Sequence, residues 1–236
     1  MKLSGHHFYQ YSTFAALMAG DLYGSISFNE LLKHGNFGLG TFHACDGELI
    51  ILDGKAYQML SSGQVNLVTE KMASPYASLT NFITDEKSNF SNISFAVLKE
   101  KLESKFPSLN IFYAIKITGN FETMNLRTVT KQEEPFSSLK AAAKDQENFI
   151  FKNINGQLVI FWAPKFANAI CVEGFHAHFI NDEKNMGGHV FDFQAKNLEV
   201  EICYLTKMNL NLPTVESYLK YQLDDHNLQA EIKAVE

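Results

Sequence analysis

The sequence has few cysteines. Cys45, Cys171 and Cys203 are the only three, and no two of them form a CxxC motif. An odd number of widely spaced cysteines argues against a disulfide framework. We therefore expect reduced thiols, most of them buried as small apolar side chains.

Long apolar runs are also absent. No stretch approaches the roughly 18 to 20 apolar residues that a membrane-spanning helix needs. Near the N-terminus the longest apolar stretch is FAALMAG, which is too short for the hydrophobic part of a secretory signal. The sequence thus predicts a cytoplasmic protein that does not associate with membranes.

Blocks of like charge are missing as well. The formal net charge is -6 and the isoelectric point is near 5.8, with acidic and basic residues mixed along the chain. This pattern does not favour binding to nucleic acid or to anionic membranes. At 236 residues and 46% hydrophobic composition, the chain is long enough to bury a substantial core.

Two segments carry signals for helices. Residues 13–34 look helical in part, with Ser27 and Glu30 at the spacing of a capping box and Gly35 placed to end the helix in a left-handed conformation. Residues 94–106 show apolar residues at helical spacing behind a serine that can cap the helix. That set consists of Ser94, Phe95, Leu98, Leu102 and Phe106.

Most of the remaining sequence is typical of strands and turns. GTFHACDGELIILDGKAYQML predicts two or three strands, and a longer run of strands extends from LNIFYAIKITGNF to LEVEICYL. The expected fold class is α+β, with mixed, largely antiparallel sheets and flanking helices. KQEEPFSSLKAAAKDQEN is the best internal boundary, although it could equally form a helix packed on a sheet. We expect two halves, 1–120 with a glycine-rich turn at 35–41 and 121–236, or else one continuous domain.

Three histidines form the clearest chemical signal. In GFHAHFINDEKNMGGHVFDF, His176 and His178 point to the same face of a strand because side chains alternate. The turn-rich NDEKNMGG can return the chain antiparallel and bring His189 beside them. Three neutral imidazoles suit Zn²⁺ or another borderline divalent ion and leave positions open for water or substrate. A metal site is thus expected on strands of the C-terminal half.

Other interpretations of these residues stay open. Strand histidines that bond only to neighbours or water would need no metal. A cupin-like site would add a glutamate soon after the HxH pair, and Glu183 lies at that distance, but it falls in the expected turn and no second cupin segment follows. Glu48 and Arg127 are single charges among strand-like neighbours, a pattern typical of edge or solvent positions.

Taken together, the sequence resembles the α-acetolactate decarboxylase family over almost its full length. The similarity rests on YQYSTFAALMAGDLYG, HGNFGLGTF, DGELIILDGKAYQ, FYAIKITGNFETMNLRTV, GFHAHFI and GGHVFDF. It implies one Zn²⁺ per chain and no organic cofactor. The site residues that it implies are His176, His178 and His189 as metal ligands, Glu48 and Arg127 as catalytic residues, and Thr41 as a residue lining the site.

The resemblance has further consequences for the ends and the assembly of the chain. It implies a C-terminal tail that folds back to the metal, with Glu236 as the matching glutamate and Glu231 as the alternative. It also implies a homodimer. Cys45 departs from the family pattern, which has an aliphatic residue before DGE, and this departure bears on the shape of the pocket.

The implied reaction is decarboxylation of (S)-2-acetolactate to (R)-acetoin and CO₂. The metal would chelate the hydroxyl and ketone oxygens of the substrate and stabilise an enediolate. Arg127 would hold the departing carboxylate, and either Glu48 or Arg127 would deliver the proton that fixes the acetoin enantiomer. The alternative function is a non-catalytic protein of the same fold that binds a metal or a small molecule, in which protein ligands would close a structural metal site.

Overall fold

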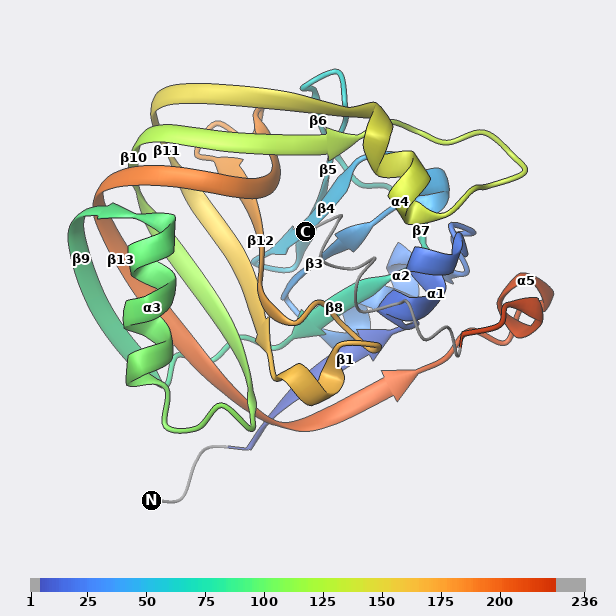
Figure 1. The fold of residues 1–236 in the computed structure, drawn as a ribbon, viewed down its shortest axis with the longest axis horizontal. Helices are drawn as coiled ribbons and strands as arrows, with labels where there is room; N and C mark the ends of the chain where they lie inside the picture. Colours follow the sequence, from blue (N-terminus) through green and yellow to red (C-terminus); the bar gives the residue numbers. More distant parts are fainter. Residues whose placement is uncertain (1–4, 224–236) are drawn as a thin grey trace.

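The computed structural model describes residues 5–223, which form mainly β-strands with a few short helices (Figure 1). The strands are β1 (His6–Tyr11), β2 (Ile26–Ser27), β3 (Phe37–Thr41), β4 (Glu48–Leu52), β5 (Lys55–Met59), β6 (Val65–Leu67), β7 (Ala73–Ser74), β8 (Ala77–Thr80), β9 (Glu86–Ser94), β10 (Phe112–Val129), β11 (Gln146–Ala163), β12 (Gly174–Asn181) and β13 (Gly187–Asn211). The α-helices are α1 (Phe14–Ala19), α2 (Phe28–Leu31), α3 (Phe95–Lys105), α4 (Leu139–Ala142) and α5 (Glu216–Lys220), and the 3-10 helices are η1 (Leu32–His34), η2 (His43–Cys45), η3 (Ala143–Asp145) and η4 (Lys165–Ala167).

One large sheet contains eleven of the strands. Its order is β10-β11-β12-β13-β1-β8-β3-β4-β5-β6, with β9 paired to β13 and with β10 also paired to β13. β1 and β13 run parallel, and the other pairs in this sheet are antiparallel. The predicted fold class, α+β with mixed and largely antiparallel sheet, is therefore confirmed.

Three long strands, β10, β11 and β13, dominate the C-terminal part of the sheet (Figure 1). Sequence runs that we expected to be separate strands, such as LNIFYAIKITGNF and MNLRTVTK, are continuous in β10. Helix α3 covers the outer face of these strands, where Phe95, Leu98 and Leu102 are buried in one apolar cluster with side chains of β10 to β13. The helix begins at the Ser94 cap, because the Ser94 side chain accepts a hydrogen bond from the Val97 N–H, as the sequence predicts.

The inner face of the same strands packs against the N-terminal strands. Val159 and Phe161 of β11 share a buried cluster with Leu39 of β3 and Ile50 of β4. This packing sets β3 and β4 opposite β11 and β12. Position 120, the expected boundary between two halves, lies inside β10, and the division of the chain at that point stays a prediction.

The N-terminal helices are shorter than the sequence suggests. α1 and α2 occupy parts of the expected segment 13–34, and Ser27 caps α2 as predicted. The left-handed ending expected at Gly35 is wrong, because this residue is extended with φ 177°. A Cβ atom there would lie 2.6 Å from the Thr80 carbonyl oxygen, so Gly35 is needed for close approach of two chain segments.

The expected glycine-rich turn at 35–41 is also wrong for most of its length, because Phe37–Thr41 forms β3. A Cβ on Gly40 would overlap the backbone of Tyr76 and Ala77 on the neighbouring strand. Glycine therefore serves close strand packing here rather than chain reversal. The segment 131–148, for which a boundary and a helix were both possible, contains α4 and η3, and α4 packs near α1.

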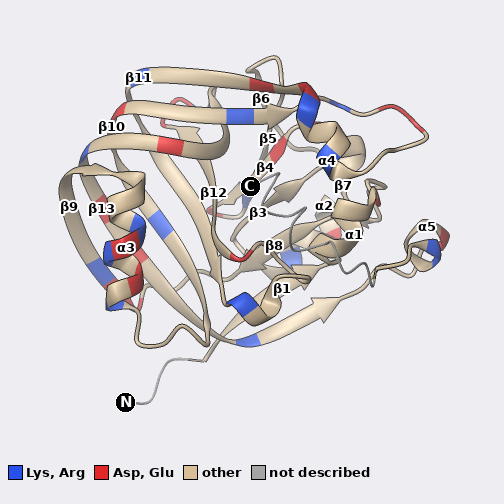
Figure 2. Ribbon diagram, in the orientation of Figure 1, with Lys and Arg blue, Asp and Glu red and all other residues tan. Residues whose placement is uncertain are grey.

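The expectation of reduced, buried cysteines also holds among residues 5–223. Cys45, Cys171 and Cys203 are free and buried. No helix in this range is long and apolar enough to cross a membrane. Acidic and basic residues are interspersed over α3 and the long strands, as Figure 2 shows.

Glu201 provides a test of the contacts between the long strands. Its carboxylate lies 2.6 Å from Lys116 Nζ on β10 and 3.1 Å from Lys87 Nζ on β9, and it accepts a hydrogen bond of 2.7 Å from the Thr84 hydroxyl. Burial acts to raise the pKa of Glu201, but these donors outweigh burial and lower the pKa to about 2. The carboxylate therefore stabilises the fold fully above its unfolded pKa, and this stabilisation is lost as the pH falls through the folded pKa.

We predict that E201Q is less stable than the unmodified protein near neutral pH and that the difference shrinks as the pH falls from about 5 to about 2. Urea unfolding at a series of pH values measures this difference. E199Q is a matched control, because Glu199 is exposed and makes one long contact with Lys87. A stability difference that does not change with pH would contradict the role assigned to Glu201.

Candidate metal centre

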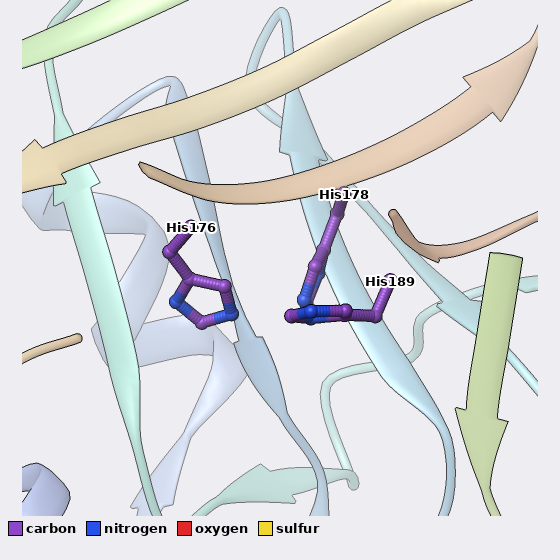
Figure 3. Close-up of side chains that lie close together, drawn as sticks. All are labelled: His176, His178 and His189. Atoms are coloured by element: carbon purple, nitrogen blue, oxygen red, sulfur yellow. The ribbon is translucent and has the colours of Figure 1, made fainter. Parts of the chain in front are cut away.

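His176, His178 and His189 meet in one buried cluster, as expected from their spacing. The first two lie on β12, and His189 lies opposite His178 in the antiparallel pair of β12 and β13. Their ring centroids are 5.0 to 5.3 Å apart, and Figure 3 shows the rings pointing toward one another. One nitrogen from each ring lies within 4.8 Å of the other two, so the three can hold a single metal ion.

The local sequence explains this convergence. Ala177 and Phe179, which alternate with the histidines, point into the outer apolar cluster under α3. The turn between β12 and β13 is held by Asn181, whose side chain bonds to Asn185 and to Glu183. Glu183 thus belongs to the turn and not to the histidine cluster, which removes the basis for a cupin-like site.

One hydrogen bond fixes the state of His178. Its Nδ1 lies 2.8 Å from the Leu49 carbonyl oxygen of β4. A carbonyl oxygen can only accept, so Nδ1 carries the proton and Nε2 has a free lone pair. This Nε2 is buried without a hydrogen-bond partner among residues 5–223 and lies 3.4 Å from Oε2 of Glu48. Two electron-rich atoms that face each other in this way fit a site for a cation.

His189 also directs an unprotonated nitrogen toward the pocket. Its Nε2 lies 3.3 Å from Nη2 of Arg127, which faces it across the pair of β10 and β13. A guanidinium group can only donate, so Nε2 of His189 is the acceptor in this contact. Imidazole nitrogens are ligands that a borderline divalent metal prefers, and binding through this Nε2 would require the Arg127 contact to open.

Burial keeps all three histidines neutral. It lowers the pKa of His178 to about 4, with the Leu49 carbonyl opposing the shift and Arg127 adding to it. The pKa values of His176 and His189 also fall well below 6.5, mainly through burial and further through the nearby Arg127 and histidines. Neutral imidazole is the form that binds metal, so the cluster needs little proton release to accept an ion.

Glu48 and Arg127 are both buried, with 8% and 6% exposure, although the sequence alone suggested edge or solvent positions. Burial raises the pKa of Glu48 to about 7, while the Arg127 charge and the Val129 N–H oppose this shift. Arg127 is the only arginine in the chain. Its Nη1 donates to Oε1 of Gln146 at 3.0 Å, and its Cζ lies 5.1 Å from the centroid of the Phe191 ring.

Thr41 lies beside Glu48 and helps to place it. The two residues are opposite each other in the pair of β3 and β4. The Thr41 hydroxyl donates to the Gly47 carbonyl oxygen at 2.8 Å, which ties the end of β3 to the turn before Glu48. Gln58 holds the same turn, since its side-chain amide donates to the Asp46 carbonyl oxygen.

A pocket joins these groups. Its polar residues are Thr41, Glu48, Arg127, His176 and His189, and Cys45 and Tyr76 also line it. The apolar lining comes from α1, β10 and the segment 139–143, namely Phe14, Leu17, Val129, Leu139 and Ala143. Burial and, to a smaller extent, the nearby Glu48 raise the pKa of Cys45 to about 12, so this thiol stays protonated.

Several of these residues were not identified from the sequence. No local pattern in the sequence pointed to Gln146 or Phe191. Each contacts Arg127 from a paired strand that is distant in sequence. Phe14 and Leu17 looked like ordinary helix residues. Glu236 and Glu231, expected near the metal, lie outside the described residues.

Comparison with known proteins gives one consistent result. The family described as alpha-acetolactate decarboxylase matches residues 8–225. The alpha-acetolactate decarboxylase of Bacillus licheniformis is 39% identical over 229 residues, which cover 97% of this chain and 90% of that protein. The protein of the same name from Lactococcus lactis subsp. cremoris is 36% identical, with 97% of each chain covered. The crystal structure of alpha-acetolactate decarboxylase from Bacillus subtilis strain 168 matches with a TM-score of 0.96 and 37% identity, over 98% of this chain and 99% of that one.

We predict that the H178A variant loses most of its divalent metal, because the variant lacks the nitrogen that the Leu49 contact directs into the cluster. Metal content after dialysis against limiting Zn²⁺ measures this loss, with about one ion per chain expected in the unmodified protein. H7A is the matched control, because His7 is exposed on β1. Full metal content in H178A would show that the ion binds elsewhere.

Proposed function

The chain belongs to the alpha-acetolactate decarboxylase family and is a carboxy-lyase, and we propose on this premise that it converts (S)-2-acetolactate to (R)-acetoin and CO₂ with one Zn²⁺ per chain. One observation carries the proposal. Three neutral histidines, the only arginine of the chain and a buried carboxyl group come together around a single pocket with an apolar wall.

The substrate sets the demands on this pocket. 2-Acetolactate is a β-keto acid with a neighbouring hydroxyl group, and loss of CO₂ leaves an electron pair that must move onto the ketone oxygen. A Zn²⁺ held by His176, His178 and His189 would supply Lewis acidity for that negative charge, so no organic cofactor is required. The protein side chains then have to bind the carboxylate, exclude water and deliver a proton.

Arg127 is suited to bind the carboxylate. Its planar guanidinium can donate two parallel hydrogen bonds to one carboxylate, which fixes the orientation of the group that leaves. The contacts with Gln146 and His189 use one nitrogen each. Nε is buried and has no hydrogen-bond partner among the described residues, so donor capacity remains for the substrate.

Glu48 is the group that we assign to proton delivery. It lines the pocket on the side of β4, and its carboxyl group, whose pKa burial raises to about 7, can exchange protons near neutral pH. The alternative donor, Arg127, contacts Gln146 and His189 and is assigned to the substrate carboxylate instead. Protonation from the fixed side of β4 would yield a single acetoin enantiomer.

The remaining parts of the proposal rest on the family. Thr41 lines the pocket, and we assign it to substrate contact. Glu236, or Glu231 in its place, would approach the metal from the C-terminal tail. A homodimer is likewise proposed from the family resemblance, and a cytoplasmic location stays a prediction from the sequence.

We predict that the purified protein forms acetoin from racemic acetolactate, that chelation removes this activity and that Zn²⁺ restores it. The acetoin produced and the metal content should be measured on the same samples, and chiral chromatography identifies the enantiomer. Restoration in parallel with about one Zn²⁺ per chain would support the metal role of the histidines. Absence of acetoin in metal-loaded protein would overturn the proposed reaction.

The single arginine permits a second test. We predict that phenylglyoxal, which reacts with guanidinium groups, inactivates the enzyme as about one arginine per chain is modified, and that a carboxylate competitor slows the inactivation. R127K should retain metal and lose at least about 100-fold in kcat/KM, because an ammonium group cannot form the two parallel bonds. If R127K turned over at a near-normal rate, the role of Arg127 would be wrong.

A further inference from the structure

Among residues 5–223, the guanidinium group of Arg127 contacts one amide and two rings. Gln146 accepts a hydrogen bond from Nη1 at 3.0 Å, Nε2 of His189 lies 3.3 Å from Nη2, and the Phe191 ring lies 5.1 Å from Cζ. A buried arginine is more often matched by a carboxylate, which offers two acceptors and cancels the charge. Here the amide of Gln146 takes that position beside the guanidinium.

The position of Gln146 follows from strand pairing. It is the first residue of β11 and lies opposite Val129 of β10. Arg127 is two residues before Val129, so its side chain emerges on the same face of β10 and can reach the amide diagonally. Both β10 and β11 are long and regularly paired in this region, so the amide is presented by a rigid element.

Few charged side chains among residues 5–223 line the pocket beside Arg127. Glu48 is the one carboxyl group among the described residues that line the pocket. A second carboxylate at position 146 would compete with the substrate carboxylate for the same guanidinium. An amide supplies the hydrogen bond without supplying the negative charge.

We propose that Gln146 is a positioning residue that orients Arg127 toward the substrate carboxylate and leaves the positive charge of Arg127 available for it. This inference rests on the proposed function. Phe191 supports the same arrangement, because a ring beside the guanidinium limits its movement and adds no charge.

Selective ¹⁵N-arginine labelling tests the positioning without any need for turnover. Because the chain has one arginine, the spectrum of the zinc-loaded protein should contain the Nε–H and Nη–H signals of Arg127 alone. A guanidinium held by Gln146 should show separate Nη signals that exchange slowly with water. We expect Q146A to broaden or merge these signals. Unchanged signals in Q146A would overturn the positioning role.

Kinetics and ligand binding test the role of charge. Q146A should lower kcat/KM about 10- to 100-fold, the range that corresponds to one hydrogen bond to a charged group. Q146E keeps an acceptor of the same size but adds a negative charge. We expect it to weaken inhibition by the anion 2-hydroxyisobutyrate at least about 10-fold, while inhibition by the neutral product acetoin changes about twofold or less.

Q157E is the matched control, because Gln157 lies on the same strand and does not line the pocket. It should leave both the Arg127 signals and the inhibition constants unchanged. If Q146E bound the anionic inhibitor as tightly as the unmodified enzyme, the charge argument would be wrong. If the unmodified enzyme formed no acetoin, the proposed function would fail, and the arginine spectrum would still decide whether Gln146 positions Arg127.

Discussion

The hydrogen bond between Nδ1 of His178 and the Leu49 carbonyl is the contact on which the site depends. It joins β12 to β4 across a sequence separation of 129 residues. It also fixes which nitrogen of His178 is free, and it places the neighbouring Glu48 carboxylate 3.4 Å from that nitrogen. One backbone carbonyl thus sets both the chemical form of a proposed ligand and its distance from the proposed proton donor.

The electrostatic balance of the pocket follows from this arrangement. Burial favours the neutral forms of Glu48 and of the histidines, whereas Arg127 remains charged. Of the 20 basic residues, only Arg127 is an arginine, and it is the one that is buried beside the histidines. Elsewhere the chain uses lysine, whose flexible ammonium group suits exposed positions. The one rigid donor therefore lies where the proposed function needs two directed hydrogen bonds to a carboxylate.

The sequence predicts the histidine cluster well because it depends on local rules. Alternation puts His176 and His178 on one face, and a short turn places His189 beside His178.

The orientation of Arg127 could not be predicted in this way. Ile117 and Phe121 of β10 point into the outer cluster, and simple alternation would send residue 127 there too. An irregularity between Phe121 and Thr123 shifts the phase, so Met124 and Leu126 face outward and Arg127 faces the pocket.

The burial of Glu48 depends on contacts that no local pattern contains. Its strand, β4, packs against β12, which is distant in sequence, and only this packing turns an apparently exposed charge into a pocket residue.

The pocket beside the histidine cluster argues against a purely structural metal. A structural site would be closed by protein ligands, whereas His176 and His189 here line a pocket that is apolar on the side of α1 and the segment 139–143. Such a wall lowers the local dielectric. In the proposed function it would strengthen the attraction between Arg127 and a bound carboxylate, so that one guanidinium could determine the orientation of a small substrate.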